Sequence, residues 1–146
     1  MKLHQLSLFL ENRPGTIKVP CRLLADAGIN LVALSLADTA EFGILRLIVR
    51  DWQRAQEVLS DAGCAVKVTE VLAVDVPDRP GGLAETLDLL DESRVGIEYM
   101  YAFTTGPRGD KAALIFRFTD PERAADVLSA HGINVLGSDI FQRMNA

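Results

Sequence analysis

Apolar and polar side chains alternate along residues 3–10, which predicts a β-strand with one buried face. The apolar positions that follow are spaced three to four residues apart as far as Gly28, which predicts a helix that ends at this glycine. Pro20 lies inside that helix and removes one backbone hydrogen bond, so we expect either a kink or a late start. The chain therefore opens with a strand followed by a helix.

The remaining pattern continues this alternation of strands and helices. Asp51 is predicted to cap the second helix, and Asp120, followed by Pro121, to cap the fourth. The expected strands span residues 3–10, 30–37, 42–50, 65–76, 95–103, 112–118 and 134–141, with a turn at 38–41 and a loop at 104–111. Of the four expected helices, the first follows Pro14-Gly15, the second covers 52–62, the third follows Pro80-Gly81, and the fourth runs from Asp120 to His131. In order, the elements form β-α-β-β-α-β twice, with the long strand shared between the two copies.

The two halves are also related residue by residue. Residues 51–66 align with residues 120–135, and Asp, Arg, Ala, Val, Leu, Ser, Gly and Val coincide, which is 8 of 16 positions. Such a repeat predicts two copies of one supersecondary unit. We therefore expect an α+β fold of two tandem ferredoxin-like modules, 1–70 and 71–146, with antiparallel sheets and helices on one face. Because units of this size bury little surface alone, we expect them to pack side by side.

A proline-glycine turn recurs between the first strand and the first helix of each half. It reads Glu11-Asn12-Arg13-Pro14-Gly15 in the first half and Pro77-Asp78-Arg79-Pro80-Gly81 in the second. Proline presets φ for the first turn of a helix, and glycine lets the backbone approach another group closely. The first N–H groups of a helix carry a partial positive charge, so this corner is able to hold a carboxylate. A tight turn without any ligand is the alternative, and the pentapeptide alone leaves both interpretations open.

Composition and charge narrow the possible partners. The chain has 146 residues, 49% of them apolar, with a net charge of −5 and a pI of about 5.0, which argues against a nucleic-acid backbone or an anionic membrane as the main partner. The sequence shows no signal-peptide core and no apolar run long enough to span a bilayer. Cys21 and Cys64 lie far apart, which predicts reduced thiols in a cytoplasmic protein. His4 and His131 have no ligand cluster around them, so we expect neither a metal nor a cofactor.

The residues around these turns resemble the ACT domain family, whose members are small βαββαβ modules that bind amino acids and regulate amino-acid metabolism. In the first half, the resemblance rests on residues 11–16, Leu24 and residues 27–31. In the second half, it rests on residues 78–83 and 95–103. Together the two units cover nearly the whole chain and leave no catalytic domain to be regulated within it. The resemblance therefore implies a stand-alone tandem ACT protein.

The resemblance also implies where a ligand binds. In ACT domains that hold a free amino acid, the ligand sits where two modules pair edge to edge. Backbone groups of the strand-1/helix-1 corner of one module hold it, and a polar side chain on strand 2 of the neighbouring module completes the site. The candidate ligand-binding residues are therefore Asn12, Arg13, Pro14, Gly15, Thr16, Ile17 and Asn30 in the first module, and Asp78, Arg79, Pro80, Gly81, Gly82, Leu83 and Gly96 in the second.

The two implied sites are not equivalent. If the modules pair within one chain, the Asp78 corner would meet Asn30, and the Asn12 corner would meet Gly96. The first pairing offers a carboxylate for an ammonium group and an amide for a carboxylate, and the second lacks one polar partner. We therefore rank the Asp78–Asn30 site first, although Asn12 departs less than Asp78 from the amino-acid-binding pattern.

Local roles compete with ligand binding at each of these positions. Asn12 and Asp78 are of the residue types that cap turns and helices. For Arg13 and Arg79, solvated surface charges are the favoured interpretation. Asn30 is equally compatible with a loop residue that follows the glycine at the end of the helix. The sequence leaves these alternatives open.

Three aromatic residues, Tyr99, Tyr101 and Phe103, share one face of an expected strand. They could line a pocket, but sheet packing against another chain is the favoured interpretation. Met100 and Ala102 make the other face apolar as well, so both faces need cover, which favours a homo-oligomer, with a dimer the simplest case.

The function implied by the resemblance is that of a regulator and not of an enzyme. It would bind an amino acid or a related small carboxylate and act allosterically, through a metabolic enzyme in trans or through its own assembly. A structural or protein-interaction module with vestigial ligand sites is the alternative. A small enzyme on this fold is less favoured, since no Ser/His/Asp or Cys/His arrangement and no phosphate-cradling glycine motif is found, and Arg13 with Asn12 matches an acyl-phosphate hydrolase only superficially. RNA binding is disfavoured by the acidity of the chain.

Overall fold

A computed structural model describes residues 2–38, 41–103, 110–137 and 141 of the chain. The chain divides into two compact units. The N-terminal unit comprises His4–Thr69, and the C-terminal unit is built from residue 70 onward with Lys2 and Leu3 added from the start of the chain. Within the described ranges, none of the helices has the length and apolar character needed to cross a bilayer.

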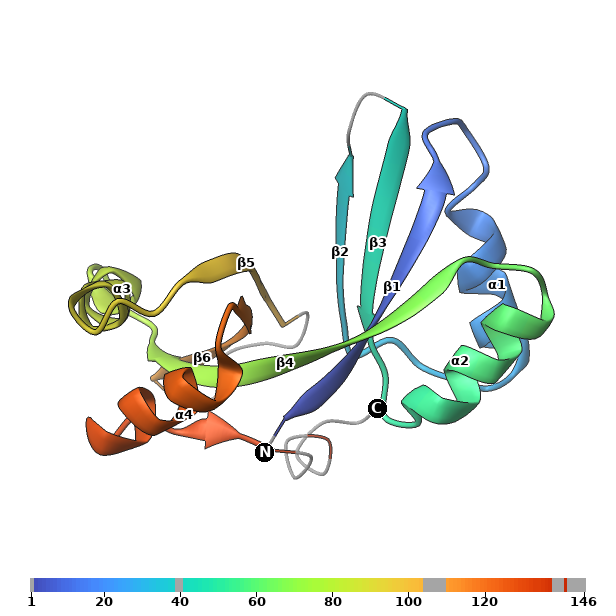
Figure 1. Cartoon of the computed structure of the whole chain (residues 1–146). Coiled ribbons are helices and arrows are strands. Elements are labelled where there is room, and N and C mark those ends of the chain that lie inside the picture. The colour runs from blue at the N-terminus through green and yellow to red at the C-terminus, as the bar shows by residue number, and fades with distance from the viewer. Residues whose placement is uncertain (1, 39–40, 104–109, 138–140, 142–146) are drawn as a thin grey trace. The chain divides into compact units, whose positions relative to one another are not determined.

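The N-terminal unit has a three-stranded antiparallel sheet to which the start of a fourth strand is added. Its elements are β1 (Leu3–Glu11), α1 (Lys18–Asp26), β2 (Ala33–Asp38), β3 (Phe42–Ile48), α2 (Trp52–Asp61) and the beginning of β4 (Val66–Pro77). The strand order is β4-β1-β3-β2, so β2 forms one edge. Figure 1 shows α1 and α2 on the same side of this sheet. Their leucines Leu24 and Leu59 are buried in one core with Leu8 and Leu45.

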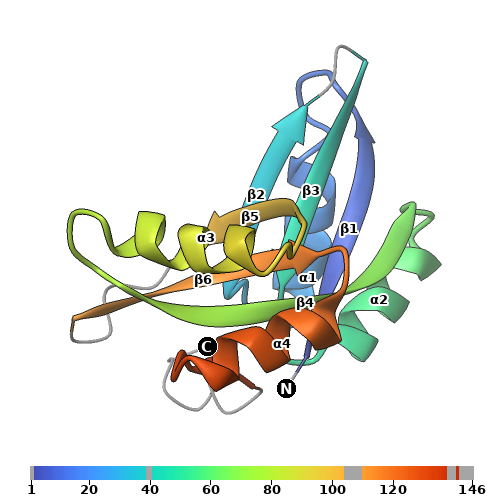
Figure 2. The same cartoon turned by 60° about the vertical axis from the view of Figure 1, so that its left-hand side comes forward.

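The C-terminal unit repeats this arrangement. The rest of β4 is followed by α3 (Gly82–Glu92), β5 (Ile97–Ala102), β6 (Lys111–Phe118), α4 (Pro121–Ala130) and β7 (Val135–Leu136), and Figure 2 shows α3 and α4 alongside β4 and β6. The strand order is β7-β4-β6-β5. Leu90 of α3 and Leu128 of α4 share one core with Val74 and with Phe116, which stacks on Phe118.

Strand register shows that the two units are equivalent position by position. Leu10 pairs with Gly43 in the first unit, and Val76 pairs with Ala112 in the second. Leu36 pairs with Leu45, and their counterparts Ala102 and Leu114 pair likewise. The structure therefore confirms tandem ferredoxin-like βαββαβ modules, and it confirms that β4 belongs to both.

Most of the local signals in the sequence act as expected. Gly28 ends α1 with a φ of +74°, a left-handed conformation that glycine adopts without a steric penalty. Asp51 and Asp120 each accept a hydrogen bond from the backbone N–H three residues later, which caps α2 and α4. Pro20 causes a late start and no kink, because α1 begins at Lys18 and its proline falls in the first turn, where a missing N–H is not needed.

Both prolines lie in the turns between strand and helix, as predicted, since Pro14 precedes α1 by four residues and Pro80 precedes α3 by two. Two expected strand boundaries were wrong. Asn30 lies in the loop before β2, and Gly96 lies just before β5, so neither residue is on a strand. Part of the loop at 104–111 and part of the strand at 134–141 lie outside the described residues, and β7 covers only Val135–Leu136 of that strand.

Candidate functional site

The turn between β1 and α1, residues 12–17, is called the first corner. Its conformation is held by Thr16, whose hydroxyl donates to the carbonyl oxygen of Glu11 at 2.8 Å and reaches that of Arg13 at 3.0 Å. The backbone N–H of Asn12 donates to the carbonyl oxygen of Glu41 at 3.0 Å. Gly15 has a φ of +91°, which lets the chain reverse direction. The corner is therefore a six-residue turn ordered by hydrogen bonds within it and to Glu11 and Glu41 beside it.

A cavity of about 270 Å³ opens beside the first corner. Its wall combines the corner with the end of β1 and with one residue each from β2 and β3, namely Leu10, Glu11, Asn12, Arg13, Thr16, Ile17, Leu36 and Gly43. All of these residues belong to the N-terminal unit. The volume lies just below the range of pockets that hold drug-sized molecules, so it suits a ligand of metabolite size.

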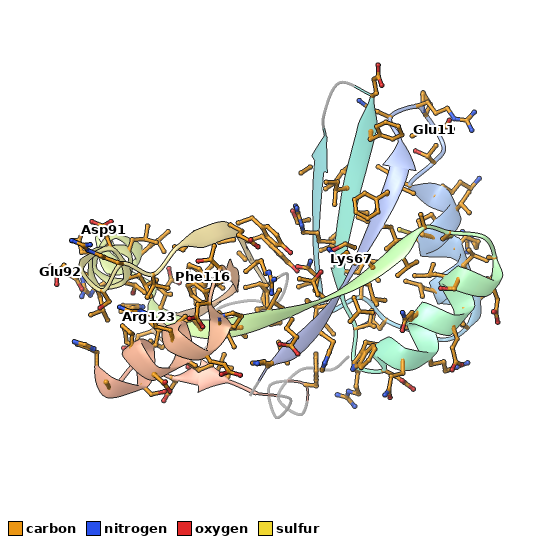
Figure 3. The ribbon with its side chains drawn as sticks, in the orientation of Figure 1. Glu11, Lys67, Asp91, Glu92, Phe116 and Arg123 are labelled. Carbon is orange, nitrogen blue, oxygen red and sulfur yellow. The ribbon has the colours of Figure 1, made fainter. Side chains whose placement is uncertain are left out.

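The charged groups of the cavity are already paired with each other. Arg13 Nε lies 2.7 Å from Glu11 Oε2, and both side chains are largely exposed. Figure 3 shows Glu11 at the end of β1, next to the turn. For the side-chain amide of Asn12, no hydrogen-bond partner is found within the described part of the chain. The polar groups that the cavity presents to a ligand are therefore the Asn12 side-chain amide and the Arg13–Glu11 ion pair, whose charges balance.

The start of α1 adds a partial positive charge to this side of the unit. Ile17 is the N-cap residue, and no side chain among the described residues caps it. The first turn, Lys18 to Pro20, contains no acidic residue. Pro20 has no N–H, but the N–H groups of Lys18 and Val19 have no partner within the helix and favour a nearby anion.

Together with the Asn12 side-chain amide, this helix start is able to hold the carboxylate of an amino acid. The Glu11 carboxylate has two acceptor oxygens, so Oε1 is able to accept from the ammonium group while Oε2 stays paired with Arg13.

The equivalent turn of the C-terminal unit, residues 78–83, is called the second corner, and it is closed by its own backbone. Gly82 opens α3 directly against the end of β4, where a Cβ atom on Gly82 would overlap the carbonyl oxygen of Pro77. The Asp78 N–H donates to the carbonyl oxygen of Asp110 at 2.7 Å, as Asn12 does in the first corner. Gly81 has a φ of +85° and is the N-cap of the helix. The turn between β4 and α3, residues 78–81, is thus two residues shorter than the turn between β1 and α1.

An ion pair covers the start of α3. Arg79 donates two hydrogen bonds to the Glu85 carboxylate, at 3.1 and 2.6 Å. Hydrogen bonding to Arg79, and then the charge of that guanidinium, hold the pKa of Glu85 below its ordinary value, and the same contacts raise the pKa of Arg79. Because Glu85 lies in the first turn of α3, the partial charge of this helix start already has an anion beside it. A ligand carboxylate would have to displace the Glu85 carboxylate from that helix start.

A second cavity, of about 280 Å³, lies in the C-terminal unit beside the residues that flank the second corner, and none of residues 78–83 lines it. It is lined by Asp75, Pro77, Glu85, Thr86, Lys111, Gly132, Ile133 and Asn134. Thr86 is buried and donates to the Gly82 carbonyl at 3.1 Å, which is a bond within the helix. This cavity therefore does not correspond to the site that the sequence predicted.

Of the fourteen predicted residues, the structure brings Asn12, Arg13, Thr16 and Ile17 together around the first cavity. Pro14 and Gly15 shape the same turn.

Gly96 has a packing role that the sequence did not reveal. A Cβ atom on Gly96 would lie 2.6 Å from the Thr119 hydroxyl, and the Thr119 N–H and hydroxyl both reach the Gly96 carbonyl, at 3.0 and 3.1 Å. This close contact accounts for a glycine at the position. The ligand-binding roles of Gly96 and Asn30 stay predictions.

Sequence reasoning missed four residues of the cavity wall: Leu10, Glu11, Leu36 and Gly43. Leu36 and Gly43 come from strands that lie far from the turn in sequence, and only the strand register places them there. One signal was available, since a glycine inside a strand often marks the close approach of a ligand or another backbone.

Comparison with known proteins identifies the family. A family model described as an ACT domain pair matches residues 1–144. The chain is 38% identical to protein BT0572 from Bacteroides thetaiotaomicron, over 94% of each chain, with a TM-score of 0.87. It also shares its fold with the regulatory subunit of aspartate kinase from Thermus thermophilus, at 15% identity over 89% of this chain and 93% of that chain, with a TM-score of 0.63.

A third solved structure, aspartate kinase from Synechocystis, is 21% identical and has a TM-score of 0.57, and the match covers 94% of this chain and 28% of the kinase. A search among curated proteins finds no match to the chain. Since the family model spans nearly every residue, the chain belongs to the ACT domain family, as a pair of ACT domains.

Proposed function

We propose that this protein is a regulatory sensor that binds an amino acid or a related small carboxylate at the first corner. The cavity of about 270 Å³ beside residues 12–17 carries the proposal, because it joins a helix start, an amide and a carboxylate in one recess. Membership of the ACT family supports a regulatory role. The protein would act on amino-acid metabolism through a partner enzyme in trans or through its own assembly, without catalysis of its own.

The resemblance implies that an edge of a second module completes such a site. Ligand binding would then favour whichever arrangement keeps that edge in place, because a ligand shifts a conformational equilibrium toward the state that binds it better. Small-angle scattering and light scattering at saturating ligand test this step. Unchanged profiles and an unchanged oligomeric state would refute it and leave ligand binding itself intact.

A thermal-shift screen against the twenty amino acids and several 2-oxo acids tests the proposed function. A ligand at one hundred times its Kd stabilises the folded state by about 2.7 kcal/mol, so one chemically related group should raise Tm by several degrees. The shift should be lost in Asn12→Ala and kept in Asp78→Ala. A flat screen at millimolar concentration would contradict the proposal.

One observation favours the second candidate, a protein-interaction module that needs no ligand. Phe9 and Phe42 are 48% and 52% exposed. Phe9 pairs with Ile44 and Phe42 with Glu11, and these pairs alternate along the strands with the core pair Leu8–Leu45. Because successive residues of a strand point to opposite faces, both rings lie on the sheet face away from the helices. Exposed aromatic side chains of this kind occur at homodimer and partner interfaces. Phe9→Ser with Phe42→Ser would then abolish self-association, measured by analytical ultracentrifugation, while ligand binding persists.

A further inference from the structure

We propose that the first cavity selects amino acids with an uncharged aliphatic side chain, and that Gly43 sets the size of side chain it accepts. This inference rests on the proposed function, because it concerns the same cavity.

The apolar part of the cavity wall is exposed to solvent. Ile17 and Leu36 are 39% and 51% exposed, although large aliphatic side chains are usually buried. Leu10 contributes a third aliphatic side chain to the same wall. An aliphatic group seated here would remove all three from water, and the hydrophobic effect would supply the affinity.

The position of Gly43 leaves room in this wall. Gly43 is buried in β3 and pairs with Leu10, so its missing side chain would point to the same face as that leucine. A Cβ atom there would lie 3.6 Å from Leu36 Cδ1 and 3.9 Å from the Ala37 carbonyl oxygen, which are ordinary contacts. The fold thus tolerates a side chain at Gly43, and the space that a methyl group would take is open cavity. Ala112, the counterpart of Gly43 in the C-terminal unit, carries that methyl group.

The charges of the cavity disfavour a charged ligand side chain. Arg13 and Glu11 neutralise each other at 2.7 Å, and they are the only ionisable residues among the described ones that line the recess. A second carboxylate or a second ammonium group on the ligand would have to break this pair or lose water without a partner. A zwitterion with an aliphatic side chain avoids that penalty.

Isothermal titration calorimetry of the full chain with alanine, valine, leucine, aspartate and lysine tests the proposal. We expect valine or leucine to bind at least tenfold more tightly than aspartate and lysine. Gly43→Ala should weaken leucine binding at least tenfold relative to alanine binding, because the added methyl group enters the space of the ligand side chain. Ala112→Ser, which enlarges the counterpart side chain in the C-terminal unit, should leave every affinity unchanged.

Leu36→Ala provides a second variant that enlarges the cavity without adding charge. It should weaken leucine binding about tenfold by removing apolar contact. Tighter binding of aspartate or lysine, or a ligand preference that Gly43→Ala leaves unchanged, would overturn the inference while the proposed function stands. No heat of binding and no thermal shift with any amino acid or 2-oxo acid would overturn both.

Discussion

The two corners of this protein share one repeated sequence pattern, but only the residues of the first corner line a described cavity. At equivalent positions, the first corner has Thr16 and the second has Gly82. Gly82 lets α3 start against the Pro77 carbonyl, where any Cβ would overlap it. The Thr16 side chain cannot fit in that way and instead donates its hydroxyl to the Glu11 carbonyl at 2.8 Å. A helix that starts two residues later leaves the cavity beside it.

A second difference acts in the same direction. Pro20 stands in the first turn of α1, and the equivalent position of α3 is held by Thr86. If α1 began as early as α3 does, the missing N–H of Pro20 would fall where the helix needs a donor. The late start of α1 therefore has two causes in the sequence, and both are absent from the C-terminal unit. The comparison teaches that a repeated motif preserves a turn without preserving a site.

The largest effect should come from giving the second corner the residue of the first. Gly82→Thr places a side chain into the Pro77 backbone, so we expect a loss of roughly 1–3 kcal/mol in the free energy of unfolding. Urea unfolding followed by circular dichroism measures it. Gly43→Ala is the matched control, since its Cβ makes only ordinary contacts, and a comparable loss in both variants would contradict this account of the second corner.

Removing the hydroxyl that orders the first corner should have a smaller effect. Thr16→Val keeps the shape of the side chain and loses its bonds to the Glu11 and Arg13 carbonyls. We expect about 1 kcal/mol less stability and about tenfold weaker ligand binding. Thr16→Ser should recover most of both in denaturation and titration experiments. Equal affinities for the valine and serine variants would show that the hydroxyl does not organise the site.

The smallest effect concerns the ion pair at the second corner. Arg79 lowers the pKa of Glu85 in the folded protein. A carboxyl with a lowered folded pKa stabilises the fold above its ordinary pKa, near 4.5, and that contribution is lost as the pH falls through the folded pKa. The stability difference between wild type and Arg79→Gln should therefore shrink between neutral pH and about pH 3. Urea midpoints across this range measure it, and a difference that grows on acidification would have the wrong sign.

Much of the fold could be predicted from the sequence, because it depends on local signals. Strand and helix periods, the Asp51 and Asp120 caps and the glycine after α1 are each encoded within a few residues. The repeat then fixed the order of elements in both halves. The turns that frame the corners could be located for the same reason.

The site could be predicted only in part, because its wall is assembled by strand register. Leu36 and Gly43 reach the cavity from β2 and β3, which local patterns do not align with the turn. The sequence ranking favoured the Asp78 corner for its charge, whereas the corner residues that line a described cavity belong to the Asn12 corner. Charge is visible in the residue type, but the space that Thr16 keeps open and Gly82 closes appears only once the backbone is placed.

The most direct test of the central claim is to titrate the best ligand from the screen into Asn12→Ala and Asp78→Ala, side by side with the wild type. The account predicts that Asn12→Ala weakens binding at least tenfold and that Asp78→Ala binds as the wild type does. Loss of binding in Asp78→Ala, with full affinity in Asn12→Ala, would contradict it and assign the ligand to the second corner.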